Sequence, residues 1–197
     1  MLQYILSHSE RYSAAELAQM AIEGGCDWIC VRMPELTDDE LKTVLQEGLL
    51  DVCRESNRIV TIDDRPELAA ELGVHGVRLS LQYQTAHPAT AAEWREKLGP
   101  EAIIGLEIID PTVTKSLAQA DIDFAYLPAR FTAEERASFI KEASRRLPIV
   151  AQGEFTDNEA FVAIDSGFKG VAVSTAITDA PDPVAATVKL LHAVWLL

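Results

Sequence analysis

The chain has 197 residues and a mass of 21.6 kDa, which suits a single domain over residues 1–197. Hydrophobic residues make up 48% of it and charged residues 24%, a balance that lets the chain bury a core and argues against disorder. The formal net charge of −14 repels phosphate backbones and anionic lipid headgroups, so we expect neither a nucleic acid nor a membrane as partner.

The cysteines and the first residues indicate the compartment. Cys26, Cys30 and Cys53 are an odd number without C-x-x-C spacing, which favours a reducing environment. The start of the chain is apolar but lacks a basic region and a cleavage site, so it is typical of a strand and not of a signal peptide. We expect a cytoplasmic protein; the sequence leaves the oligomeric state open, a homo-oligomer included.

An internal repeat runs through the chain. Four segments combine a helix-ending residue, a polar residue and an apolar strand, with equivalent polar positions at Asp27, His75, Asp123 and Lys169. These positions recur at intervals of 48, 48 and 46 residues, which indicates a repeated supersecondary unit. Further apolar runs lie between and before them. The expected strands lie at 3–6, 58–62, 102–106 and 148–152 and within 24–31, 72–79, 120–127 and 166–173.

Helical patterns fill the intervals between these strands. They cover 14–22, 38–53, 66–72, 91–98, 111–118, 133–147, 158–166 and 183–196. Thr37 and Glu40 have the spacing of a capping box, and Asp64 before Pro66 suits an N-cap. Alternating apolar strands and helices are typical of a parallel sheet, and eight units of about 25 residues favour a single α/β domain, a (β/α)8 TIM barrel. The alternative is an open, doubly wound sheet.

Charged residues follow most of the expected strands. In a parallel barrel the strands end at the C-terminal face, where catalytic groups gather. Among the residues at these ends are Arg32, Asp64, Arg78, Glu107 and Glu154. Charges at the ends of apolar strands are costly to desolvate, so they mark either a functional pocket or ion pairs that close the barrel. Arginines and carboxylates are about equally numerous at these strand ends, so the sequence predicts that Glu107 contacts an arginine.

Five segments carry a resemblance to a known family. They are DWICVRMPE, TIDDRPELAAELGVHGVRLS, IIGLEIIDP, PIVAQGEFTDNEAFVAIDSGFKGVAVSTAI and APDPVAATVKLL. In this order the chain resembles the thiamine phosphate synthase/TenI superfamily of TIM barrels over nearly its whole length. In the synthases, a pyrimidine methyl diphosphate loses pyrophosphate, with magnesium, and a thiazole phosphate captures the pyrimidine. The resemblance implies a site for such phosphorylated small molecules.

Arg32, Asp64 and Glu107 are the candidate catalytic residues. The family's Gln-x-Arg-x-Lys cluster is reduced here to Arg32, and its metal-binding aspartate falls on Asp64. The family's second metal carboxylate falls on Tyr83, and its serine after strand five falls on Glu107. Asp64 is therefore the one candidate ligand for Mg²⁺, and we expect any dependence on magnesium to be weak or absent.

The candidate phosphate-binding residues come from the last two strands. The family's Gly-Gly after strand seven falls on Gly153 and Glu154, and its turn after strand eight falls on Thr175 and Ala176. Arg78 is the further candidate for phosphate contact. A carboxylate repels a phosphate, so the sequence predicts that Glu154 weakens phosphate binding at this site.

Two alternatives to a synthase remain open at the level of the sequence. One is a non-catalytic TenI-like regulatory or accessory barrel. The other is an isomerase of the thiazole tautomerase type, although the histidine that the tautomerases use after strand five falls on Ile109. The sequence thus predicts a phosphorylated small-molecule ligand and leaves catalytic activity open.

Overall fold

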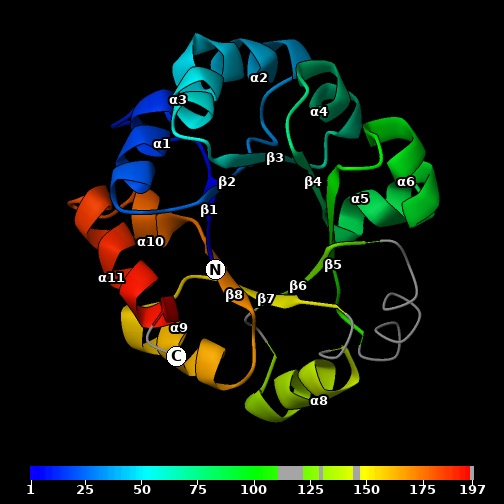
Figure 1. Ribbon diagram of the computed structural model, residues 1–197, viewed down its shortest axis with the longest axis vertical. Helices are drawn as coiled ribbons and strands as arrows, with labels where there is room; N and C mark the ends of the chain where they lie inside the picture. The colour runs from blue at the N-terminus through cyan, green and yellow to red at the C-terminus, as the bar shows by residue number, and fades with distance from the viewer. Residues whose placement is uncertain (111–121, 129–130, 144–146, 196–197) are drawn as a thin grey trace.

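The computed structural model describes residues 1–110, 122–128, 131–143 and 147–195 and confirms the predicted barrel. Eight parallel strands close in chain order (Figure 1). They are β1 (Leu2–Leu6), β2 (Trp28–Val31), β3 (Ile59–Asp63), β4 (Gly76–Leu79), β5 (Ile103–Glu107), β6 (Phe124–Pro128), β7 (Ile149–Gln152) and β8 (Gly170–Val173). Because β1 pairs with both β2 and β8, the open sheet is excluded.

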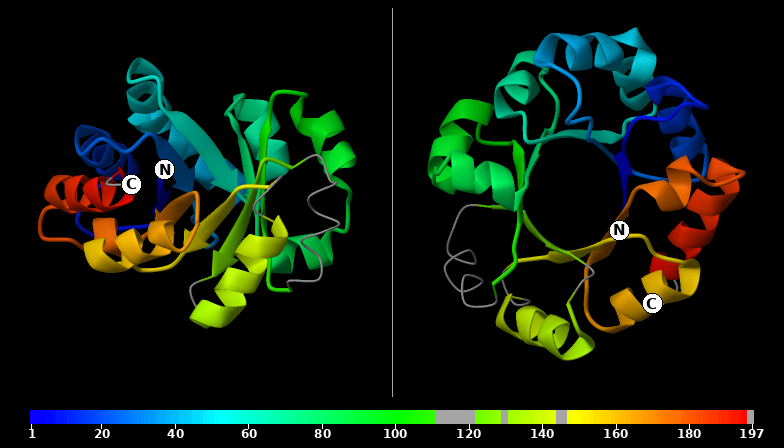
Figure 2. Two further views of the ribbon diagram at one scale, coloured as in Figure 1. Left: turned by 60° about the horizontal axis from the view of Figure 1, so that its bottom comes forward. Right: turned by 180° about the vertical axis from the view of Figure 1, so that it is seen from behind.

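Helices surround the barrel on its outer face, as Figures 1 and 2 show. They are α1 (Ala14–Glu23), α2 (Asp38–Val44), α3 (Leu50–Glu55), α4 (Pro66–Leu72), α5 (Leu81–Ala86), α6 (Ala91–Leu98), α8 (Ala133–Ala143), α9 (Asp157–Asp165), α10 (Thr175–Thr178) and α11 (Pro183–Trp195). The helix predicted over 111–118 lies outside the described residues, as do positions 144–146 of the one predicted over 133–147. None of the helices in the described part of the chain is long and apolar enough to cross a membrane.

Two helices differ from the sequence prediction. The segment 38–53, predicted as one helix, is interrupted by a π-helical turn, η1 (Leu45–Leu49), in which Gly48 has a φ of +106°. Glycine adopts this backbone conformation without a steric cost. The chain also forms α5 directly after β4, a helix without buried residues and therefore without the apolar periodicity that would predict it.

Side chains fill the inside of the barrel, among them the buried ring of Tyr126 on β6. Its buried hydroxyl accepts a hydrogen bond from Gln3 Nε2 at 3.0 Å. The ring passes over Gly105 on β5, where an added Cβ atom would lie 2.3 Å from Tyr126 Cε2. The position of the ring therefore requires glycine at residue 105.

We expect Gly105→Ala to lower the free energy of unfolding by about 1–3 kcal/mol, because the added methyl group overpacks the ring of Tyr126. Denaturant titration of both proteins measures the difference. The same substitution in a Tyr126→Ala background is the control, since the opposing ring is then absent. An equal loss in both backgrounds would contradict this explanation.

Candidate functional site

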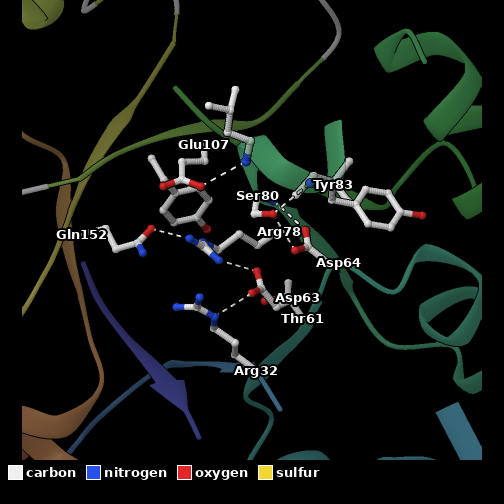
Figure 3. Close-up of polar contacts among 12 residues, drawn as sticks. Arg32, Thr61, Asp63, Asp64, Arg78, Ser80, Tyr83, Glu107 and Gln152 are labelled. Atoms are coloured by element: carbon white, nitrogen blue, oxygen red, sulfur yellow. Dashed lines mark hydrogen bonds and ion pairs between the residues drawn. The ribbon is translucent and has the colours of Figure 1, made fainter. Parts of the chain in front are cut away.

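A cavity of about 610 Å³ opens where the strands β2 to β5 end. Arg32 lines it after β2, Asp63 and Asp64 line it at the end of β3, and Glu107 lines it at the end of β5 (Figure 3). The three candidate catalytic residues therefore share one cavity. Arg78 from β4 extends into the middle of the same group of side chains.

A buried ion pair lies among these side chains at the C-terminal ends of the strands, which we call the mouth of the barrel. The side chains of Arg78 and Asp63 are 2% and 5% exposed, and Arg78 Nη1 donates to Asp63 Oδ1. Arg78 Nη2 donates to Gln152 Oε1 on β7 at 2.5 Å. The guanidinium carbon lies 5.4 Å from the ring centroid of Tyr126, a cation–π contact. Residues from three other strands thus fix one arginine.

The two charges of this pair depend on each other. Burial disfavours a charged guanidinium, but the charge and hydrogen bond of Asp63, together with other nearby groups, outweigh burial and raise the pKa of Arg78. Burial also disfavours the charged form of Asp63 and so raises the pKa of its carboxyl group, while the charge of Arg78 opposes this shift. Arg78, a candidate for phosphate contact, therefore has both amino nitrogens engaged by the protein itself.

Arg32 has donors that the protein does not use. Its Nε lies 3.2 Å from Asp63 Oδ2, and its side chain is 49% exposed. Within the described residues, no hydrogen bond or ion pair engages its two amino nitrogens. A guanidinium with this edge open suits a bidentate contact with a phosphate or carboxylate. Asp63 thus orients Arg32 while leaving its amino groups available to a ligand.

Asp64 does not cap the helix after it, so the predicted N-cap is wrong. Helix α4 begins after Arg65 without a side-chain cap. Asp64 instead has a φ of +54° and accepts two hydrogen bonds of 2.6 Å from Ser80, one from the backbone N–H and one from Oγ. The physical reason is α5, whose N-cap, Ser80, lies beside the end of β3 and offers two donors at once.

Glu107 holds the same end of α5. Its Oε2 accepts a hydrogen bond from the backbone N–H of Leu81 at 3.1 Å. The predicted contact between Glu107 and an arginine is not found among the described residues, because Arg78 pairs with Asp63 and Gln152 instead. The first N–H groups of a helix have no partners within it, so they attract a carboxylate.

Whereas Arg78 lies with Asp63 and Gln152, three of the five candidate phosphate-binding residues meet at a second cavity of about 460 Å³. Glu154, Thr175 and Ala176 line it, and Gly153 precedes them with its N–H bonded to the carbonyl of Ala172 at 3.1 Å. Glu154 Oε2 accepts a hydrogen bond of 2.8 Å from the backbone N–H of Ala176 at the start of α10. A carboxylate of the chain thus engages a donor that the family resemblance assigns to a phosphate.

Sequence reasoning assigned no role to Ser80 or Gln152. The sequence does place Gln152 at the C-terminal face, as a polar residue at the end of an otherwise apolar strand. Ser80 follows a strand at the same face, but its role could not be assigned, because it depends on a helix that the sequence pattern does not indicate. Across the described ranges, no three His, Cys, Asp or Glu side chains come together as a metal site.

Known proteins resemble this chain over nearly its whole length. A thiamine-phosphate synthase of Bacteroides thetaiotaomicron is 35% identical, over 97% of this chain and 96% of its own. One of Natronomonas pharaonis is 32% identical, over 95% of this chain and 90% of its own.

A solved structure shows the same fold. The thiamine phosphate pyrophosphorylase from Pyrococcus furiosus superposes with a TM-score of 0.83 at 22% identity, covering 98% of this chain and 94% of its own. The model of one family, described as thiamine monophosphate synthase, matches residues 3–177. A match of this extent, together with the relatives, shows that the chain belongs to the thiamine monophosphate synthase family.

Proposed function

We propose that this protein binds phosphorylated thiazole and pyrimidine intermediates of thiamine biosynthesis and joins them as a transferase of the thiamine phosphate synthase type. The proposal rests on one observation: the amino nitrogens of Arg32 are open to the cavity of about 610 Å³ at the mouth of the barrel. The relatives named thiamine-phosphate synthase, which cover nearly the whole chain, support the same class of ligand.

The proposed reaction needs positive charge at the leaving group. The thiazole nitrogen forms a bond to the pyrimidine methylene carbon as the bond from this carbon to the diphosphate oxygen breaks. The electron pair leaves with pyrophosphate, so negative charge grows on its oxygens. Arg32 is placed to stabilise this charge. Glu107 keeps Oε1 without a partner among the described residues, as an acceptor for an N–H group of a heterocycle.

The second cavity is the proposed site for the phosphate of the thiazole. The backbone N–H of Ala176 and the first turn of α10 provide donors for an anion, once the carboxylate of Glu154 has moved away. In this proposal Glu154 competes with the ligand for the same donor.

We also propose that the protein works in the cytoplasm. Cys26, Cys30 and Cys53 are free and buried, which supports a reducing compartment. Phosphorylated small molecules of biosynthesis are the expected partners there.

Binding of the two ligands tests the proposal directly. Calorimetric titration with thiazole phosphate and with the pyrimidine diphosphate is expected to show binding of both. Arg32→Gln should weaken binding of the diphosphate by at least about tenfold, since it removes the open guanidinium. Arg54→Gln is the matched control, because Arg54 pairs with Asp51 on the surface of α3. If neither ligand binds, the proposed function is wrong.

The condensation itself should be slow. We expect thiamine phosphate to form at a rate below the range of about 1–1,000 s⁻¹ common among enzymes, because Glu107 stands where the family places a small hydroxyl group. Chromatography of the product over time measures the rate. A rate inside the common range would show that other groups of this chain replace the missing ones.

Removing the carboxylate of Glu154 should strengthen binding of thiazole phosphate. We expect Glu154→Gly to increase the affinity by about tenfold, since it frees the Ala176 N–H and removes a repulsive charge. Asp157→Asn is the matched control, because Asp157 lines the same cavity but does not bond to Ala176. Calorimetry that finds unchanged or weaker binding in Glu154→Gly refutes the competition.

A further inference from the structure

The carboxylates at the mouth are already used by the chain. Both oxygens of Asp63 face arginines, with Oδ1 accepting from Arg78 Nη1 and Oδ2 lying 3.2 Å from Arg32 Nε. A cation that approached Asp63 would meet the positive charge of both guanidinium groups. Asp63 is therefore unsuited to bind a metal ion.

Asp64, the candidate ligand for Mg²⁺, is engaged in the same way. Each of its oxygens accepts a hydrogen bond of 2.6 Å from Ser80. Ser80 Oγ in turn accepts from the backbone N–H of Tyr83, so these bonds hold the first turn of α5. A metal ion on Asp64 would compete with both bonds and loosen this helix end.

The other carboxylates that line this cavity are engaged as well, since Asp38 pairs with Arg65 and Glu67 pairs with Lys97. Glu107 Oε2 is bonded to the N–H of Leu81, which leaves only Oε1. Tyr83 lines the cavity from the first turn of α5, but a tyrosine phenol is neutral near pH 7, and burial raises its pKa further, to about 12. Mg²⁺ is usually held by one or two carboxylates in a near-octahedral set of oxygens. The residues at this mouth do not fit that ion.

Arg32 provides the charge that a metal would otherwise supply. It is held in place through Nε by Asp63, and its amino nitrogens are free for a ligand. A guanidinium with both amino nitrogens available can bind phosphate oxygens as a fork.

We propose that this mouth binds phosphate groups through Arg32 without a divalent cation. The inference deepens the proposed function, because it concerns how the same cavity neutralises its ligand. It differs from the magnesium-assisted chemistry that the family resemblance implies, and it follows from the engagement of Asp63, Asp64 and Glu107 by the chain's own donors.

The test compares phosphate binding with and without magnesium. Full-length protein is titrated calorimetrically with inorganic phosphate and with thiazole phosphate, at constant ionic strength, once with MgCl₂ and once with EDTA. Both are monophosphates, so Mg²⁺ sequesters little of the free ligand. MgCl₂ alone is titrated into the protein as a direct measure of metal binding. The variants are Arg32→Gln and the surface control Arg54→Gln.

We expect each dissociation constant to agree within about twofold between MgCl₂ and EDTA, and MgCl₂ alone to produce no binding signal. Arg32→Gln should weaken inorganic phosphate by at least about tenfold in both buffers, whereas Arg54→Gln should leave it unchanged. Weakening of inorganic phosphate binding by more than about tenfold in EDTA would overturn the inference, as would binding of inorganic phosphate that is insensitive to Arg32→Gln.

The two ligands separate this inference from the proposed function. If inorganic phosphate binds through Arg32 only with magnesium while thiazole phosphate binds, the inference fails and the proposed function stands. If inorganic phosphate binds through Arg32 without magnesium but thiazole phosphate does not bind, the proposed function fails and the inference stands. If inorganic phosphate does not bind at millimolar concentrations, the inference is overturned.

Discussion

The mouth of this barrel depends on one charge that cannot remain alone, the buried guanidinium of Arg78. Breaking a buried ion pair by removing one partner typically costs about 3–5 kcal/mol, so Asp63 has to face inward from the neighbouring strand. Gln152 and the ring of Tyr126 also contact the guanidinium of Arg78. Asp63 can then orient Arg32 with its second oxygen, which turns a structural requirement into an arrangement that a ligand can use.

Carboxylates at helix starts are the second constraint on the site. Asp64 and Glu107 engage the first donors of α5, and Glu154 engages a first-turn donor of α10. The first N–H groups of a helix attract anions whether these come from a ligand or from the chain. In this protein the chain supplies the anions itself, which explains how a family barrel can keep its fold while the electrostatics of its mouth change.

The barrel could be predicted from the sequence because its signals are repeated. Intervals of 48, 48 and 46 residues and eight apolar runs leave little choice of topology, and the ends of the strands identify Arg32, Asp64 and Glu107 as neighbours. The partners of these residues could not be predicted. They depend on α5, a short exposed helix without apolar periodicity, which brings Ser80 to Asp64 and Leu81 to Glu107.

The hydrogen bond between Glu154 and Ala176 has a kinetic consequence. If a phosphate binds at α10 as proposed, it meets a donor already in use, so only the fraction of molecules with Glu154 turned away is competent to bind. The observed dissociation constant is the intrinsic one divided by this fraction. An exposed side chain changes rotamer within nanoseconds, so this opening is a rapid equilibrium and lowers the observed association rate constant by the same fraction, without a plateau at high ligand concentration.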